Sequence, residues 1–137
     1  MYSEVVSAED LDTAARTVWG EARGEFQEGR VAVAKVIVNR SEKGGWWGDT
    51  LKRVCLKPWQ FSCWNESDPN REKMISLPKT DPEYLDCLAA VAEALVSDDT
   101  SLDKFYHYHT KAISPDWADE ATDRVIVGNH VFLKGIK

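Results

Sequence analysis

A helical pattern that ends in charged residues constrains this 137-residue chain more than any other feature. Ser7 and Asp10 have the spacing of a helix N-cap and its third-position partner. Gly24 is a typical residue for the end of a helix. Between these limits, apolar residues recur at helical spacing and predict an amphipathic helix with one apolar face: Leu11, Ala14, Ala15, Val18 and Ala22.

Two carboxylates, Glu21 and Glu25, lie four residues apart where this helix is expected to end. At about 100° per residue, Glu21 falls at the margin of the apolar face, in the last turn, where the helix dipole is negative. Partial burial and that field both disfavour the ionised carboxylate and raise its pKa. Cleavage of a glycosidic bond needs such a protonated acid. The simpler alternative is that both are solvated charges at a helix end.

Residues 30–40 fit either a buried helix or a buried strand by pattern alone. The C-terminal third has the pattern of extended strands. Gly128-Asn129 between two apolar runs is typical of a hairpin turn. The predicted elements are a short helix from Asp49-Thr50 to Cys55, loops over 57–80 with one short helix near 71–77, a helix from Asp81-Pro82 to before Ser97, and strands over 105–109, 125–127 and 130–133. We therefore expect a single α+β domain over 1–137, mostly helical, with a small antiparallel sheet near the C-terminus.

The charge balance limits the partners of the chain. With 23 acidic and 17 basic residues, the net charge is −6, which argues against general binding of nucleic acids or anionic membranes. No apolar run approaches the ~20 residues that span a bilayer, so no stable membrane insertion is expected. Residues 1–7 lack the basic start and apolar core of a secretion signal. Three cysteines at wide spacing favour reduced thiols in a protein made in the cytoplasm.

Two further groups of residues could carry chemistry. Residues 57–65 alternate aromatic with amide and hydroxyl side chains, which suits sugar rings and their substituents but also suits a loop fixed by buried aromatics. His107 and His109 would share one face of a strand, as zinc ligands or a general base do. No third ligand stands at a recognisable spacing, so packing or surface histidines are the better interpretation. The pair Trp46-Trp47 could bind glycan or cover the core.

The stretch Val18-Trp19-Gly20-Glu21-Ala22-Arg23-Gly24-Glu25, followed by the apolar run to Asn39-Arg40, resembles the catalytic domain of the SleB/CwlJ cell wall hydrolases. These include spore-cortex lytic enzymes and phage endolysins. The Gln60-Phe61-Ser62 segment, the aromatic residues 106–108 with Pro115 and Trp117 after them, and the closing Gly128-Asn129-His130-Val131-Phe132 are similar to later motifs of the family. The resemblance covers about residues 11–132 and favours a helix over residues 30–40.

The resemblance implies a lysozyme-like fold and a peptidoglycan-degrading enzyme without metal or other cofactor. Its catalytic acid falls on Glu21. Glu25 would hold the site together or act as a second carboxylate. Substrate contacts carried over from the family fall on Gln60, Ser62, Trp64, Tyr106, Tyr108 and Trp117.

The reaction expected from the resemblance is cleavage between N-acetylmuramic acid and N-acetylglucosamine. A lytic transglycosylase, in which Glu21 acts as acid and then as base, is favoured over a hydrolytic muramidase. The chain would be a monomeric phage or prophage endolysin. It would be made in the host cytoplasm without a signal and would reach the wall through a separate membrane-permeabilising protein. Two alternatives are a non-catalytic glycan-binding module and a metal-dependent amidase or peptidase that uses His107 and His109.

Overall fold

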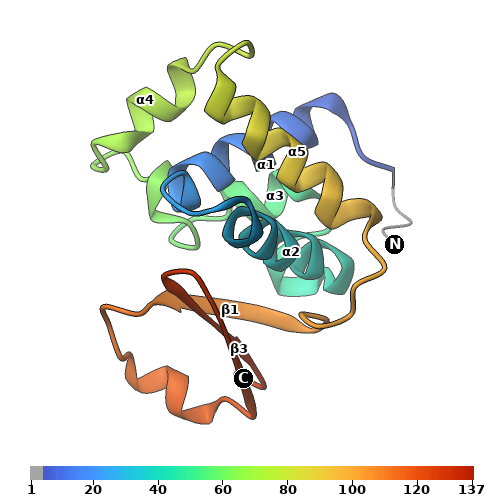
Figure 1. The fold of residues 1–137 in the computed structure, drawn as a ribbon, viewed down its shortest axis with the longest axis vertical. Coiled ribbons are helices and arrows are strands. Elements are labelled where there is room, and N and C mark those ends of the chain that lie inside the picture. Colours follow the sequence, from blue (N-terminus) through green and yellow to red (C-terminus); the bar gives the residue numbers. More distant parts are fainter. Residues whose placement is uncertain (1–4) are drawn as a thin grey trace.

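The computed structural model describes residues 5–137, in which helices form one body and a small sheet lies beside it (Figure 1). Residues 1–4, in which no secretion signal was expected, lie outside the described residues. The helices are α1 (Ala8–Ala22), α2 (Gln27–Lys43), α3 (Leu51–Leu56), α4 (Asn70–Ser76) and α5 (Pro82–Val96), with short 3-10 turns η1 (Gly45–Trp47), η2 (Ser62–Trp64) and η3 (Asp116–Glu120). The strands are β1 (Phe105–Thr110), β2 (Asp123–Val127) and β3 (His130–Lys134). The predicted class, mostly helical with a small antiparallel sheet, is confirmed.

The first helix begins as its sequence predicts. The Ser7 hydroxyl accepts the Asp10 backbone N–H at 3.0 Å, and the Asp10 carboxylate accepts the Ser7 N–H at 3.1 Å. The helix ends at Ala22, two residues before Gly24, which leaves Glu21 in its last turn. Because α1 packs against α5, α3, α2 and α4, its end is held inside the helical body.

Residues 30–40 are helical, and α2 extends further than expected at both ends. Val33, Val36 and Ile37 are at most 1% exposed. Burial against the neighbouring helices therefore outweighs the strand preference of these β-branched side chains.

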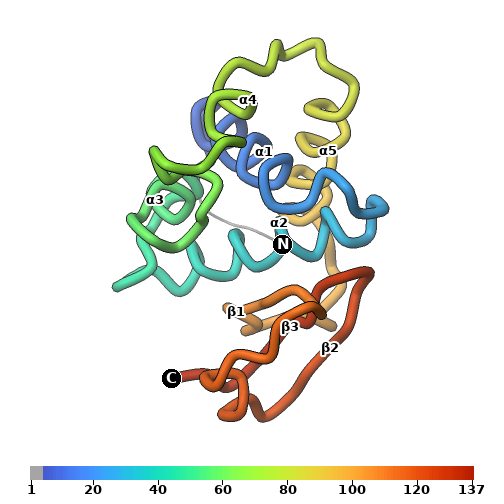
Figure 2. The backbone as a smooth tube through the Cα atoms, turned by 90° about the vertical axis from the view of Figure 1, so that its left-hand side faces the viewer, coloured from blue at the N-terminus to red at the C-terminus, as the bar shows by residue number. Residues whose placement is uncertain are grey.

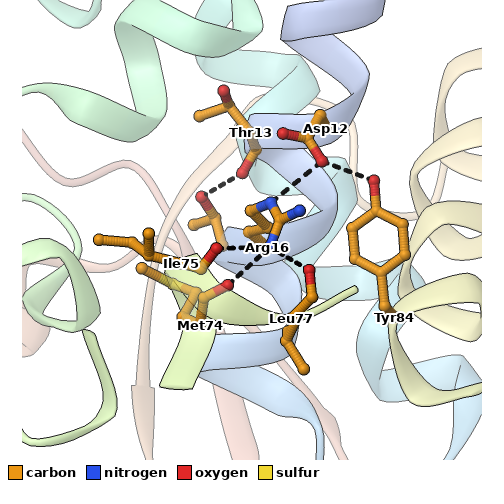
Figure 3. A network of polar contacts seen from close by, with 8 residues as sticks. Asp12, Thr13, Arg16, Met74, Ile75, Leu77 and Tyr84 are labelled. Carbon is orange, nitrogen blue, oxygen red and sulfur yellow. Dashed lines mark hydrogen bonds and ion pairs between the residues drawn. The ribbon is translucent and has the colours of Figure 1, made fainter. Parts of the chain in front are cut away.

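The predicted start of α5 is also confirmed, since the Asp81 carboxylate accepts the Tyr84 N–H at 2.9 Å and Pro82 occupies the first turn. One arginine joins α1 to the C-terminal end of α4. Figure 3 shows Arg16 beside Asp12, with its Nη1 donating to the carbonyls of Met74 (2.8 Å), Ile75 (3.2 Å) and Leu77 (3.0 Å). These carbonyls come at the end of α4, where backbone acceptors lack helical partners.

The sheet has the strand order β1-β3-β2, with both pairs antiparallel and the predicted Gly128-Asn129 turn between β2 and β3. It lies against α2, on the opposite side from α4 and α5 (Figures 1 and 2). Two side chains of α2 join it to β1. The Asn39 amide donates to the carbonyl of Phe105 at 3.0 Å, and Arg40 Nε donates to the carbonyl of Tyr106 at 2.8 Å.

No helix within residues 5–137 is long and apolar enough to cross a membrane. The three cysteines, Cys55, Cys63 and Cys87, are free and buried.

Candidate active site

The carboxyl of Glu21 lies where the end of α1 meets the sheet. The Tyr108 hydroxyl of β1 donates to Glu21 Oε1 at 2.6 Å, and the Cys63 thiol of η2 forms a second hydrogen bond to the same carboxyl. Burial raises the pKa of Glu21 above its usual value. The hydrogen bonds from Tyr108 and Cys63 and the nearby His130 oppose this effect without cancelling it. Glu21 is therefore an acid that keeps its proton to higher pH than an exposed glutamate.

Tyr108 is held by its neighbours in the sheet. It pairs with Phe132 on β3, with ring centres 5.5 Å apart, and its ring meets that of His130 edge-on at 5.2 Å. Burial raises the pKa of Tyr108 well above its usual value, and the adjacent Glu21 adds to the shift. The phenol consequently stays protonated and acts as a donor to Glu21.

Cys63 is a site residue that the sequence reasoning missed. Burial and the nearby Glu21 raise the pKa of the Cys63 thiol, so it remains a protonated donor. It packs directly on the last turns of α1, because a Cβ atom added to Gly20 would lie 2.7 Å from Cys63 Cβ and 2.9 Å from Sγ. The only sequence signal was its place beside Ser62 in the 57–65 segment.

Glu25 has a different environment from Glu21. Its Oε1 accepts the Asn129 backbone N–H at 2.7 Å and lies 3.1 Å from His130 Nδ1, while Oε2 accepts the Asn129 side-chain amide at 3.0 Å. Burial alone would raise its pKa, but the Asn129 hydrogen bonds and the His130 interactions outweigh burial and lower it. Gly128 permits this approach, because it has φ +58° and a Cβ there would lie 2.8 Å from Glu25 Oε1. Glu25 therefore fastens the β2–β3 turn to the segment that follows α1.

The polar and aromatic side chains of residues 59–64, the end of the loop and η2, differ in their exposure. Gln60 lines a hollow of about 450 Å³ together with Tyr106, and Ser62 is exposed. Trp64 is turned toward the helical body, where its indole N–H donates to Thr17 Oγ1 at 2.9 Å. Trp59, to which the sequence assigned no specific role, is 83% exposed and has φ +70°. A bulky residue in the left-handed region is uncommon and marks strain of the kind found at binding sites.

The aromatic residues of β1 face two sides. The ring of Tyr106 stacks on that of Trp47 at 6.3 Å, and Trp47 also meets His107 edge-on at 5.4 Å, where the register of β1 is irregular between Phe105 and His107. Trp117 contacts His107 at 5.7 Å and His109 at 6.0 Å. Because side chains alternate along a strand, the Trp117 side is opposite to the one from which Tyr108 reaches Glu21.

The histidine pair has no metal-ligand environment in the described part of the chain. No three His, Cys, Asp or Glu side chains of residues 5–137 are grouped as metal ligands. Burial, with a contribution from the Arg40 charge, lowers the pKa of His107 to about 4. His109 Nδ1 lies 2.7 Å from the carbonyl of Thr110. Hydrogen bonding and packing account for both rings.

A half-buried carboxyl with a raised pKa, held by two donors at the junction of a helical body and a sheet, is the type of group that general acid catalysis uses. The chain belongs to the Cell Wall Hydrolase family, whose model matches residues 24–133. It is 30% identical over 135 residues to a spore cortex-lytic enzyme of Oceanobacillus iheyensis, covering 93% of this chain and 42% of that protein. It is 28% identical over 128 residues to the spore cortex-lytic enzyme of Bacillus subtilis, covering 93% and 38% respectively.

Solved structures agree with this assignment. The catalytic domain of the Bacillus cereus SleB protein superposes with a TM-score of 0.75 at 26% identity, covering 97% of this chain and 95% of that one. The catalytic domain of a germination-specific lytic transglycosylase, SleB of Bacillus anthracis, superposes with a TM-score of 0.73 at 26% identity, covering 96% and 99%. The chain thus matches these catalytic domains almost completely and spans about two fifths of the two curated relatives.

We predict that Glu25→Ala lowers the free energy of unfolding by about 2–3 kcal/mol, because charge-assisted hydrogen bonds to the hairpin are lost. Glu28→Ala removes an exposed carboxylate three residues away and should change stability by less than about 0.5 kcal/mol. Urea denaturation of both variants measures the difference. Equal effects of the two substitutions would contradict the role of Glu25 as a fastening residue.

Gly20→Ala should destabilise the protein by about 1–3 kcal/mol, because its methyl group overlaps Cys63 and displaces η2. Gly24→Ala is the matched control, since a Cβ there meets nothing within 4 Å and the change should be neutral within about 0.5 kcal/mol. Thermal unfolding of both variants tests the close contact between α1 and Cys63. A neutral Gly20→Ala would show that this contact is not tight.

Proposed function

We propose that this chain cleaves the glycan strands of peptidoglycan at the β-1,4 bond between N-acetylmuramic acid and N-acetylglucosamine, with Glu21 as the general acid. The observation that carries the proposal is the half-buried Glu21 carboxyl, whose pKa is raised and whose orientation is fixed by Tyr108 and Cys63. Membership of the Cell Wall Hydrolase family and the names of the relatives support the substrate class.

The proposed reaction starts with protonation of the glycosidic oxygen by Glu21 as an oxocarbenium-like centre forms on the muramyl sugar. Glu21 becomes a carboxylate in this step. The hydrogen bonds from Tyr108 and Cys63 then strengthen, because their acceptor gains charge. The same two donors that position the acid therefore also stabilise its conjugate base.

The second step is proposed to be intramolecular. Glu21 removes the proton from the muramyl 6-hydroxyl, which attacks the anomeric carbon and gives a 1,6-anhydro product, so no second carboxylate is required. Glu25 is a poor candidate for one, because both its oxygens bind the β2–β3 turn. We therefore favour the lytic transglycosylase outcome.

A hydrolytic muramidase is the second candidate, and Asp68 is the observation that favours it. The Asp68 charge acts on Glu21 and contributes to raising its pKa, and Asp68 Oδ1 accepts the Asn70 N–H at 2.8 Å at the start of α4. In that scheme Asp68 would activate the water. Asp68→Asn would then abolish release of reducing ends, whereas a transglycosylase would keep forming anhydro ends.

Substrate contacts are proposed for the exposed and half-buried residues around the acid. Gln60, Ser62 and Tyr106 would line the groove, and the exposed Trp59 would stack on a sugar ring. Trp64 and Trp117 would support the walls, given the hydrogen bond of Trp64 to Thr17 and the histidine contacts of Trp117.

The endolysin role, the monomeric state, synthesis in the cytoplasm and access through a membrane-permeabilising protein stay predictions from the sequence.

We predict that Glu21→Gln lowers the rate of glycan cleavage by at least about 100-fold, because the amide cannot protonate the leaving oxygen. The measurement is a digest of purified peptidoglycan with mass analysis of the released muropeptides. Wild type should release disaccharide-peptides with anhydro ends, which are one water lighter than reducing ends. Undiminished cleavage by the variant would reject Glu21 as the acid, and release of peptides from intact glycan, abolished by a chelator, would favour an amidase or peptidase.

The pH profile of kcat/KM tests the Tyr108 contact. Activity requires protonated Glu21 and should fall as pH rises through its raised pKa. The Tyr108 hydrogen bond stabilises the carboxylate, so Tyr108→Phe should raise this pKa further and move the alkaline limb to higher pH. The maximal rate should fall about tenfold, because the carboxyl loses its orientation. Tyr106→Phe should leave the limb in place, and an unshifted limb in Tyr108→Phe would contradict the assignment.

A further inference from the structure

A second feature of the structure lies between η1, the 57–60 loop and β1. It is the hollow of about 450 Å³ that Gln60 and Tyr106 line, together with Lys43, Trp46, Trp47, His107, Ile136 and Lys137. Lys57 lies at the edge of this hollow, over the Trp46 ring, and also lines an adjoining hollow with Lys52 and Arg53. We call the residues that line the first hollow, together with Lys57, the cation–aromatic pocket.

The pocket is connected to the acid through shared elements. Tyr106 precedes Tyr108 by two residues on β1, and Gln60 precedes Cys63 by three. Arg40 connects β1 with η1. Its Nε donates to the carbonyl of Tyr106 at 2.8 Å, and its guanidinium carbon lies 4.2 Å from the centre of the Trp47 ring. A polymer bound at Glu21 would therefore reach the pocket with an adjoining part of its length.

The charges at the pocket are unusual for this acidic chain. Lys43 Nζ lies 4.7 Å from the centre of the Tyr106 ring, and Lys57 Nζ lies 4.3 Å from the centre of a Trp46 ring. Within residues 5–137, neither ammonium group forms an ion pair with a carboxylate. An aromatic face orients a cation without neutralising it. Both lysines are thus free to pair with an anionic ligand.

Two nearby cations, which line the adjoining hollow with Lys57 and Trp46, do form ion pairs. Lys52 pairs with Glu9 at 2.7 Å, and Arg53 pairs with Asp49 at 2.9 Å. Of these four cations around η1, Lys43 and Lys57 are the two that have no carboxylate partner within residues 5–137. Trp46 is 63% exposed there, and Gln60 adds an amide. Exposed aromatic surface, an amide and two free ammonium groups match a short peptide that carries carboxylates.

We propose that the cation–aromatic pocket binds the carboxylate-bearing stem peptide attached to the glycan strand that Glu21 cleaves, and so makes the enzyme selective for peptide-substituted strands. This inference rests on the proposed function. Lys43 and Lys57 pair with the peptide carboxylates, Trp46 covers the peptide backbone, and Gln60 hydrogen-bonds an amide. The lactyl carboxylate of a muramic acid without its peptide is a second source of the same charge, and the experiment separates the two.

The test compares soluble glycan strands that carry peptides with the same strands after amidase treatment, which leaves the lactyl carboxylates. Wild type should show a higher kcat/KM on the peptide-bearing strands. The double variant Lys43→Gln, Lys57→Gln should lose roughly tenfold on these strands through KM and little on the stripped ones, because exposed ion pairs are individually weak. The double variant Lys73→Gln, Lys79→Gln has the same charge change on the exposed surface around α4 and should keep the preference.

Equal losses of the lysine variant on both substrates, or no preference in wild type, would overturn the inference. Binding of both strands to Glu21→Gln, with and without the two lysine substitutions, gives a readout independent of cleavage. If wild type cuts no glycan but Glu21→Gln still binds peptide-bearing strands through the two lysines, the proposed function fails and the pocket stands. If wild type cuts both strands equally and binding ignores the lysines, the proposed function stands and the pocket fails.

Discussion

The hydrogen bond from Tyr108 to Glu21 joins the two halves of this molecule. It connects the last turn of α1 with Tyr108 of the edge strand β1, whose ring packs on Phe132 of the middle strand β3, and so holds a helix-end carboxyl against the sheet. Burial of that carboxyl raises its pKa, and the donors around it keep the ionised form accessible during a reaction. Removal of the sheet would leave Glu21 as an ordinary solvated glutamate at a helix end.

Glu25, the second carboxylate of the motif, also contacts the sheet, but there its pKa is lowered instead of raised. Glu25 lies beyond the end of α1, accepts three polar contacts from the hairpin turn and has a lowered pKa. Ionised Glu25 fixes the sheet on the helical body, and the fixed sheet brings Tyr108 to Glu21. Glu21 and Glu25 are therefore the same residue type four positions apart, but one is an acid and the other attaches the sheet. The difference comes from their environments.

Much of this fold follows from local chemistry in the sequence. The Ser7 and Asp81 caps and the Gly128-Asn129 turn are short-range interactions, and each predicted the element observed. The helix α2 did not follow from its pattern, because its β-branched residues owe their conformation to tertiary burial. For the same reason, the only sequence signal for Cys63 was its place in the 57–65 segment, which does not reveal its role. Its contact with Glu21 exists only when η2 packs on Gly20, a consequence of the assembled helices.

The most direct test of this account is a pH titration of the carboxyl carbons of Glu21 and Glu25 by ¹³C NMR, assigned with the Gln variants. The account predicts that the Glu21 midpoint lies above the ordinary value of 4.5 and the Glu25 midpoint below it. Coincident midpoints, or a Glu21 midpoint at or below 4.5, would contradict the claim that burial under the sheet makes Glu21 the acid.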